Sequence, residues 1–141
     1  MALLDIRPIL VGYILDDADV AALIVDRFMP TRLDQGERRA SVVYRFIGGT
    51  GEHTMQGVAG LVHLRLQIDA YAPTSGQALQ VANAVKFRLD GLRGRLEGPD
   101  SPPTVARVQG VMFASEREEL FDEASGLFRK SRDYIIHFEE R

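Results

Sequence analysis

The alternation of apolar and polar residues from position 61 to 71 constrains the fold more than any other feature of the sequence. Successive side chains of a strand point to opposite faces, so this alternation predicts a long β-strand. One face should enter a core, and the other should be solvated or contact a neighbour. The apolar set is Val62, Leu64, Leu66, Ile68 and Ala70, and the polar set is His63, Arg65, Gln67 and Asp69.

Further strands are predicted at residues 41–47, 104–115 and 127–138, which are rich in β-branched and aromatic residues. Residues 25–33 are extended too, but Pro30 has no N–H for a ladder and restricts them to a sheet edge or strand end. Mixed polar faces of this kind are solvent-exposed or form wet subunit contacts, and the sequence leaves both open. On the last two strands the polar residues are Arg107, Gln109, Arg129, Ser131 and Asp133.

Two helices are predicted near the N-terminus. Residues 3–15 carry apolar residues three and four apart, with Pro8 marking either the helix start or a kink. Asp16 or Asp17 can cap a short second helix over residues 18–24.

A third helix is predicted after Thr74, which stands three residues before Gln77 in a capping-box arrangement. Gly94 is its predicted stop. Its apolar face should pack on the central strand, so we expect Leu66 and Val85 to share one core. That face comprises Ala78, Val81, Ala82, Val85, Leu89 and Leu92.

The connections differ in composition. Residues 34–39 and 96–103 are predicted loops because they contain Gly or Pro among polar residues. Residues 48–60 hold five glycines and are too long for a tight turn, which predicts a mobile β-hairpin arm that becomes ordered against a partner. Residues 116–126 form a long acidic hairpin connection.

The order helices, strand, strand, strand, helix, strand, strand predicts an α+β fold. The sheet should be mostly antiparallel and packed on one side by helices. The length of 141 residues, without a repeat or linker, predicts a single domain over residues 1–141.

Composition argues against several classes of protein. The formal net charge is −3, and the arginines are interrupted by acidic residues, so tight phosphate binding is not expected. The absence of cysteine excludes disulfides, thiolate nucleophiles and Cys-based zinc sites. We expect neither a signal peptide nor a membrane helix, because the sequence lacks a clean apolar leader and any run of 18 apolar residues.

No catalytic, cofactor-binding or metal-binding constellation is predicted. The glycines after residue 47 lack the lysine and the following helix of a phosphate loop. His53, His63 and His137 have no partner at metal-ligand spacing and are interpreted as surface imidazoles. Five carboxylates in eight residues are interpreted as a solvated loop or a charged partner contact; these are Glu116, Glu118, Glu119, Asp122 and Glu123.

Taken together, several segments resemble the tail-completion family of tailed phages, which is related to siphophage tail terminators. The most specific are residues 67–72, Gln-Ile-Asp-Ala-Tyr-Ala, and the acidic connection that ends in Gly126, Leu127 and Phe128. Residues 16–24, 27–30, 42–44 and 51–54 complete the pattern, which spans nearly the whole chain. No catalytic residue is carried over.

The resemblance implies an α+β virion structural protein that forms a homo-oligomeric, hexameric ring. Such a ring caps the tail tube protein and joins it to the head–tail connector, in a phage, prophage or gene transfer agent. DNA would pass through the lumen without sequence-specific binding, and the particle would be assembled in the bacterial cytoplasm. We expect neighbouring copies to meet through charged residues, with Arg38, Arg39 and Arg45 of one copy facing the acidic set Glu116, Glu118, Glu119, Asp122 and Glu123 of the next. Glu52 and His53 of the glycine-rich arm are expected to belong to the same interface.

Three alternatives stay open. A head–tail connector component would share the ring but dock differently. A small enzyme or ligand-binding module would place a polar pocket under the helix that follows Thr74. A nucleic-acid binder would use the sheet face.

Overall fold

The computed structural model describes residues 5–54 and 57–139, with the side chains of residues 48–61 outside the described part. The helices are α1 (Arg7–Leu15), α2 (Ala18–Ile24) and α3 (Ser75–Leu89). The strands are β1 (Phe28–Pro30), β2 (Ser41–Thr54), β3 (Gly57–Ala72), β4 (Gly94–Glu97), β5 (Val105–Glu116), β6 (Leu120–Asp122) and β7 (Leu127–Glu139). None of the helices in this part of the chain is long and apolar enough to cross a membrane.

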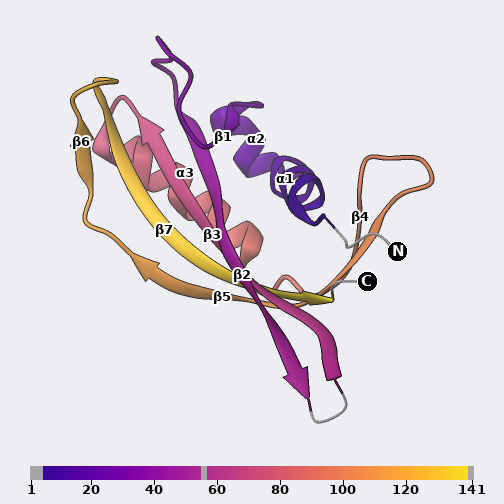
Figure 1. Ribbon diagram of the computed structural model, residues 1–141. Helices are drawn as coiled ribbons and strands as arrows, with labels where there is room; N and C mark the ends of the chain where they lie inside the picture. Colours follow the sequence, from indigo (N-terminus) through magenta and orange to yellow (C-terminus); the bar gives the residue numbers. More distant parts are fainter. Residues whose placement is uncertain (1–4, 55–56, 140–141) are drawn as a thin grey trace.

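The strands form one curved sheet in the order β1-β2-β3-β7-β5-β4, and β6 pairs with the start of β7 beside β5 (Figure 1). Every pairing is antiparallel except that of β1 with β2. The three helices contribute to one core on one face of the sheet. The predicted α+β class is therefore confirmed.

Local sequence accounts for the first two helices. Pro8 occupies the first turn of α1, where its missing N–H costs no intrahelical bond. Asp17 caps α2, since its carboxylate accepts a hydrogen bond from the Val20 N–H at 3.1 Å. Both helices bury apolar residues in the main core, including Leu10 and Ile24.

Helix α3 covers β3 and β7. The Thr74 hydroxyl accepts from the Gln77 N–H at 3.2 Å, as the capping signal predicted. Leu66 and Val85 are both buried in the same cluster, which confirms the predicted core. Each buried side chain of this kind stabilises the fold by about 1.5–3 kcal/mol.

The predicted end of α3 is wrong. The helix ends at Leu89, Asp90 has extended backbone angles, and Gly91 takes the left-handed conformation with φ +74°. Glycine adopts this conformation at little cost, so Gly91 and not Gly94 releases the chain from the helix.

Two short strands lie where the sequence predicted loops. Strand β4 includes Leu96 and Glu97 and pairs with Val105–Val108 of β5. Strand β6 lies inside the acidic connection and pairs with residues 127–129. Both pair with the next part of the chain, across residues 98–104 for β4 and 123–126 for β6, and this backbone pairing rather than local composition makes them extended.

Strands β2 and β3 form the predicted hairpin, paired as far as Thr54 and Gly57. Pairing of β3 with β7 stops at Leu61 in the described residues, and Figure 1 shows the hairpin projecting past the rest of the sheet. Residues 55–56 and the side chains of the arm lie outside the described part. The predicted ordering of the arm on assembly stays a prediction.

Candidate functional site

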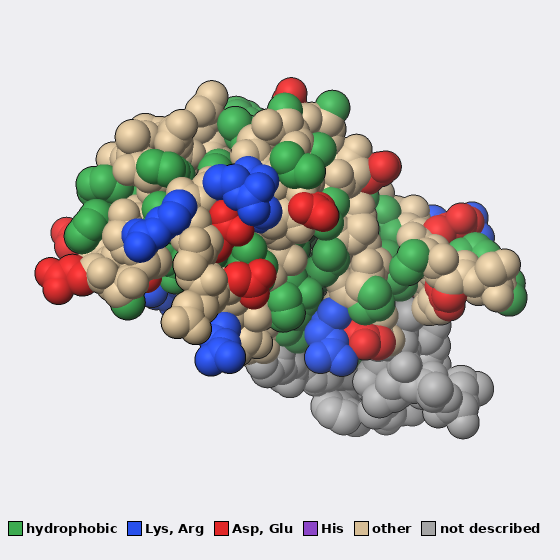
Figure 2. Space-filling view, turned by 90° about the horizontal axis from the view of Figure 1, so that it is seen from above, with side chains coloured by type: hydrophobic (Ala, Val, Ile, Leu, Met, Phe, Trp, Pro, Cys, Tyr) green, Lys and Arg blue, Asp and Glu red, His purple; other side chains and the backbone are tan. Residues whose placement is uncertain are grey.

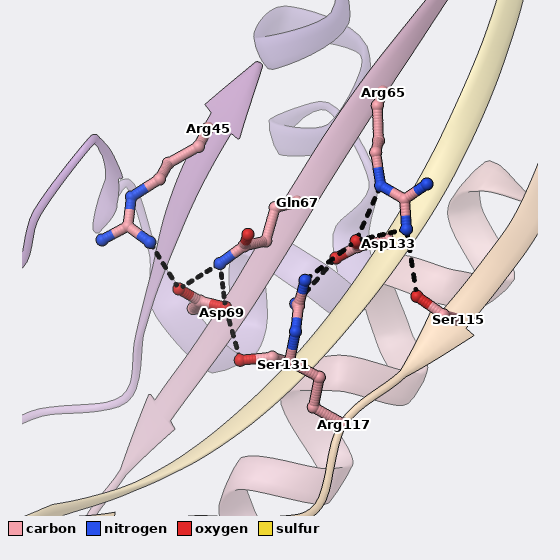
Figure 3. Close-up of polar contacts among 8 residues, drawn as sticks. All are labelled: Arg45, Arg65, Gln67, Asp69, Ser115, Arg117, Ser131 and Asp133. Atoms are coloured by element: carbon pink, nitrogen blue, oxygen red, sulfur yellow. Dashed lines mark hydrogen bonds and ion pairs between the residues drawn. The ribbon is translucent and has the colours of Figure 1, made fainter. Parts of the chain in front are cut away.

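The side of the sheet opposite the helices carries a network of charged side chains, here called the polar face (Figure 3). Its residues come mainly from β3 and β7, which pair with each other over twelve positions from Leu61 to Ala72. Two carboxylates, Asp69 and Asp133, lie in this network fully buried. A buried charge is costly unless it is paired, so their partners determine what this face can do.

Asp133 is held by two arginines. Arg65 donates through Nε to Oδ2 at 2.9 Å, and Arg117 donates to Oδ1 and Oδ2 at 2.9 and 3.1 Å. The Ser115 hydroxyl accepts a further bond from Arg65 Nη2 at 3.2 Å. Charge-assisted and two-pronged bonds of this type are the strongest polar contacts available to a carboxylate.

Asp69 has a mixed set of partners. The Ser131 hydroxyl donates to it at 2.6 Å, and Gln67 Nε2 lies 3.1 Å from both carboxylate oxygens. Arg45 Nη1 approaches at 3.6 Å as an ion pair. Asp69 is therefore satisfied within the subunit.

In this network, partly exposed arginines are held in place by the buried carboxylates of Asp69 and Asp133. Arg45, Arg65 and Arg117 remain 42%, 40% and 50% exposed, while both carboxylates beneath them are buried. Three positive and two negative charges leave one net positive charge. The polar residues of β3 and β7 thus bind one another through hydrogen bonds and ion pairs, and water alone does not solvate them.

Sequence reasoning missed Arg117 as a member of this site. Its position in the connection after β5 gave no local indication that it turns back onto β7. The only signal was the run of polar residues at alternate positions of both strands, since opposing polar residues on one face are positioned to pair.

The acidic connection is not one uniform patch. Glu116 binds Arg132 at 2.8 Å and Lys130 at 3.2 Å, and the Arg132 hydrogen bond lowers the pKa of Glu116. The Ser75 hydroxyl donates to Glu119, and Ser125 donates to Asp122 at 2.8 Å. Glu118 and Glu123 are the two members that are exposed without a described hydrogen bond or ion pair.

The basic candidates are also engaged within the subunit. Arg38 Nη1 donates to the Ser125 carbonyl at 2.6 Å, which places it against the acidic connection of its own chain. Arg39 pairs with Glu37 at 2.9 Å and lowers the pKa of that carboxyl to about 2. Arg45 donates to the Thr31 carbonyl at 2.9 Å in addition to its ion pair.

Figure 2 shows basic and acidic side chains interspersed over the face seen from above, without a patch of a single sign. The side chains of Glu52 and His53, predicted for the same contact, lie outside the described residues. The structure therefore brings Arg38 to the acidic connection but assembles no single charged site from the eight candidates whose side chains it describes.

His63 and His137, interpreted as surface imidazoles, are partly exposed and contact each other. They are directly opposed on β3 and β7, both are half-buried, and their ring centroids are 4.1 Å apart. Facing positions on adjacent strands bring the rings together, although the residues are far apart in the sequence. Within residues 5–54 and 57–139, no group of three His, Cys, Asp or Glu side chains could hold a metal ion.

The space between α3 and the sheet is filled by side chains. Ala78, Val81 and Val85 are buried there in the core, and the open groove in this region lies between the helices instead. Its polar groups tie helices together, since Arg88 donates to the Tyr13 carbonyl at 2.9 Å and lies over the Tyr13 ring. The described geometry offers no support for a ligand pocket under α3.

Comparison with known proteins identifies the family of this chain. The sequence matches the family described as "Tail completion protein gp17" over residues 10–125. Among solved structures, the fold is similar to a chain of "Virion of native gene transfer agent (GTA) particle", with 17% identity and a TM-score of 0.61. That match covers 92% of this chain and 91% of the other. A comparison with curated proteins finds no match.

The family match extends from α1 through the acidic connection and includes most of the sheet. It also includes Arg65, Asp69 and Arg117 of the polar face, whereas Ser131 and Asp133 follow its end. The chain therefore belongs to the tail completion protein gp17 family and is a structural protein of tail completion in a phage-type virion.

Proposed function

We propose that this chain is a single-domain, non-enzymatic subunit of a closed ring that caps the tail tube and joins it to the head–tail connector. The family match over residues 10–125 carries this proposal. It is supported by the similarity of the fold, over nearly the full length of both chains, to a chain from a gene transfer agent virion. Six copies are proposed, with the tail tube protein and the connector as partners and no cofactor.

DNA is proposed to pass through the lumen without sequence-specific binding. The chain carries a formal net charge of −3, and the arginines of the polar face are each paired with a buried carboxylate. Phosphate binding requires cationic groups that can release counterions, and paired arginines have less charge to offer. A lumen lined by surfaces of this charge would let DNA slide through.

Charged contacts between copies are proposed to steer assembly more than to hold it. Exposed ion pairs contribute about 0–1 kcal/mol each. Glu118 and Glu123 are the members of the acidic set free to meet a neighbour without losing a described internal contact. On the opposing side, Arg39 is the most available candidate, because its side chain is 68% exposed although its partner Glu37 is only 11% exposed.

Electron microscopy of particles that lack this protein tests the proposed role. Over-long tails are expected if it terminates the tail, and adding back the wild-type gene should restore the length. Tail-less, DNA-filled heads would instead indicate a head–tail connector component. Turnover of a small substrate by the purified protein would contradict a purely structural role.

The charge contribution is tested by Glu118→Lys combined with Glu123→Lys. The fold should be unchanged, and tail completion should be slowed most at low ionic strength, where charge contacts are least screened. Glu97→Lys is the matched control, because Glu97 is an exposed carboxylate on β4 away from the connection. Equal completion by the double variant and wild type would show that these carboxylates do not steer assembly.

A further inference from the structure

The sheet has two open edges, because its outermost strands are short. β4 covers β5 only at Val105–Val108, so residues 109–116 of β5 have no strand on that side in the part of the chain that is described. β1 covers β2 only at Val42–Tyr44, so β2 is likewise uncovered from Arg45 onward among the described strands. An uncovered strand exposes unpaired N–H and C=O groups that bind another strand readily.

The two open edges lie at the same height across the sheet. Following the register from strand to strand, Ile47 lies opposite Arg65, Arg65 opposite Ile135, and Ile135 opposite Met112. The next row runs in the same way from Phe46 through Leu66 and Tyr134 to Phe113. The open part of β2 therefore begins level with the open part of β5.

The two edge strands also run in opposite directions. Each step from β2 to β3, from β3 to β7 and from β7 to β5 is antiparallel, and three reversals leave β5 antiparallel to β2. Rotating one copy about an axis along the strands would thus bring its β5 beside the β2 of the next copy in antiparallel orientation. Such a contact joins two different surfaces, so it can be repeated around a ring until the ring closes.

Apolar side chains mark both edges at the matched rows. Ile47 is 45% exposed and Met112 is 55% exposed, and their rows place both on the polar face. Phe113 is 38% exposed on the helix side, where its ring meets Tyr134. Phe46 lies on the same side in a groove of about 910 Å³ beside α1. Beside an uncovered strand, exposed apolar side chains favour pairing with another strand.

We propose that neighbouring copies join by antiparallel pairing of β2 with the partner subunit's β5. Ile47 then packs against the partner subunit's Met112, and Phe46 against the partner subunit's Phe113. The occupant of each open edge is a second copy because the edges match one another in height, direction and apolar character. This inference rests on the proposed ring and specifies which surfaces close it.

A cysteine cross-link tests the pairing directly, since the natural chain has no cysteine. Ile47→Cys and Met112→Cys are introduced together, and virions are purified and exposed to a mild oxidant. Within one subunit the two positions are separated by β3 and β7, roughly 14 Å at ~4.8 Å per strand spacing. A disulfide requires Cα atoms within about 7 Å, so only neighbouring copies can be linked.

The expected result is a ladder of covalent oligomers that ends at the ring. Each single-cysteine variant is a matched control and should remain uncross-linked. A head-to-tail contact does not bring a residue next to the same residue of a neighbouring copy. Ile47→Cys with Leu79→Cys is a second control, since Leu79 is exposed on α3 and outside the matched rows.

Three results would overturn the pairing. They are an assembled ring without a ladder, a cross-link in a single-cysteine variant, and a cross-link to a different virion protein. The proposed function is checked separately by the mass of the wild-type assembly released from virions. A released protein that is monomeric under conditions that preserve the tail would refute the ring itself.

Charge substitutions provide an independent readout. Ile47→Lys alone and Met112→Glu alone should each reduce tail completion at least tenfold, since each places a charge in the apolar contact. The double variant should recover most of the loss, because every interface then holds one lysine and one glutamate. Failure of the double variant to recover, with both single variants folded, would contradict direct contact between the two positions.

Discussion

The two faces of β3 both bury side chains, but by different means. Leu66, Ile68 and Ala70 are buried under the helices by apolar contacts. On the other face, Asp69 is equally buried, yet polar partners from β2, β3 and β7 enclose it. The same strand therefore joins an apolar core to a charged layer.

This difference determines how each face responds to change. On the apolar face, a substitution should lower stability in proportion to the apolar area it removes from the core, since the contacts there are individually small and numerous. Introducing a charge there should cost more. On the polar face, each buried carboxylate needs its partners, because removing an arginine leaves the carboxylate buried and unpaired. Substitutions on the two faces should thus differ in how much they lower the free energy of unfolding and in how that loss depends on pH.

The largest effect is expected from Leu66→Asp on the apolar face. A carboxylate there has no partner in the core, and the cost of several kcal/mol is comparable to the whole stability of a domain, about 5–15 kcal/mol. Circular dichroism and urea denaturation should show an unfolded or aggregated protein. Leu79→Asp, at an exposed position of α3, should change stability by no more than about 0.5 kcal/mol. A cooperatively folded Leu66→Asp variant would show that the face is assigned incorrectly.

Asp133→Ala should have the next largest effect and tests the polar face. It removes three charge-assisted hydrogen bonds, but Arg65 and Arg117 are 40% and 50% exposed and can be solvated instead. We expect a loss of about 2–3 kcal/mol in the free energy of unfolding. Glu97→Ala, which breaks the exposed pair with Arg95, should cost about 0–1 kcal/mol. Equal costs in the two variants would mean that burial of the charge adds nothing.

The apolar face should also show an alkaline pH dependence, through Tyr134. Burial raises the pKa of its hydroxyl to about 12, above the value of about 10 in an unfolded chain. The neutral form is the one that the folded state favours, so this stability is fully present below pH 10 and is lost as the pH rises towards 12. We expect a loss of about 2 kcal/mol in thermal or urea denaturation. Tyr134→Phe should remove this component, and an unchanged alkaline profile would contradict it.

The smallest effect is expected from Ser131→Ala, which removes one partner of Asp69. The carboxylate keeps Gln67 and Arg45, so the loss should be about 1 kcal/mol. Ser125→Ala removes a hydroxyl that donates to the less buried Asp122 and accepts a long bond of 3.3 Å from the Leu127 N–H, and it should cost less. A larger loss at Ser125 than at Ser131 would reverse the predicted ranking.

Local patterns in the sequence predicted the main elements of the fold. The alternation in β3, the Asp17 and Thr74 caps and the position of Pro30 each depend on interactions within a few residues. The shared core of Leu66 and Val85 followed from the apolar faces of two elements. The family resemblance came from the same information and is confirmed by the family match.

The remaining features depend on residues that are distant in the sequence. Arg65 and Asp133 are 68 positions apart, and the opposed rings of His63 and His137 also come from different strands. Strands β4 and β6 have partners nearby in the sequence, but their extended form comes from backbone pairing that the Gly, Pro and acidic residues of these segments did not indicate. Which polar residues are buried, and which edges stay open, depends on strand order and register. These arise from the pairing of whole strands, because a backbone ladder accepts many sequences and local composition does not select its neighbour.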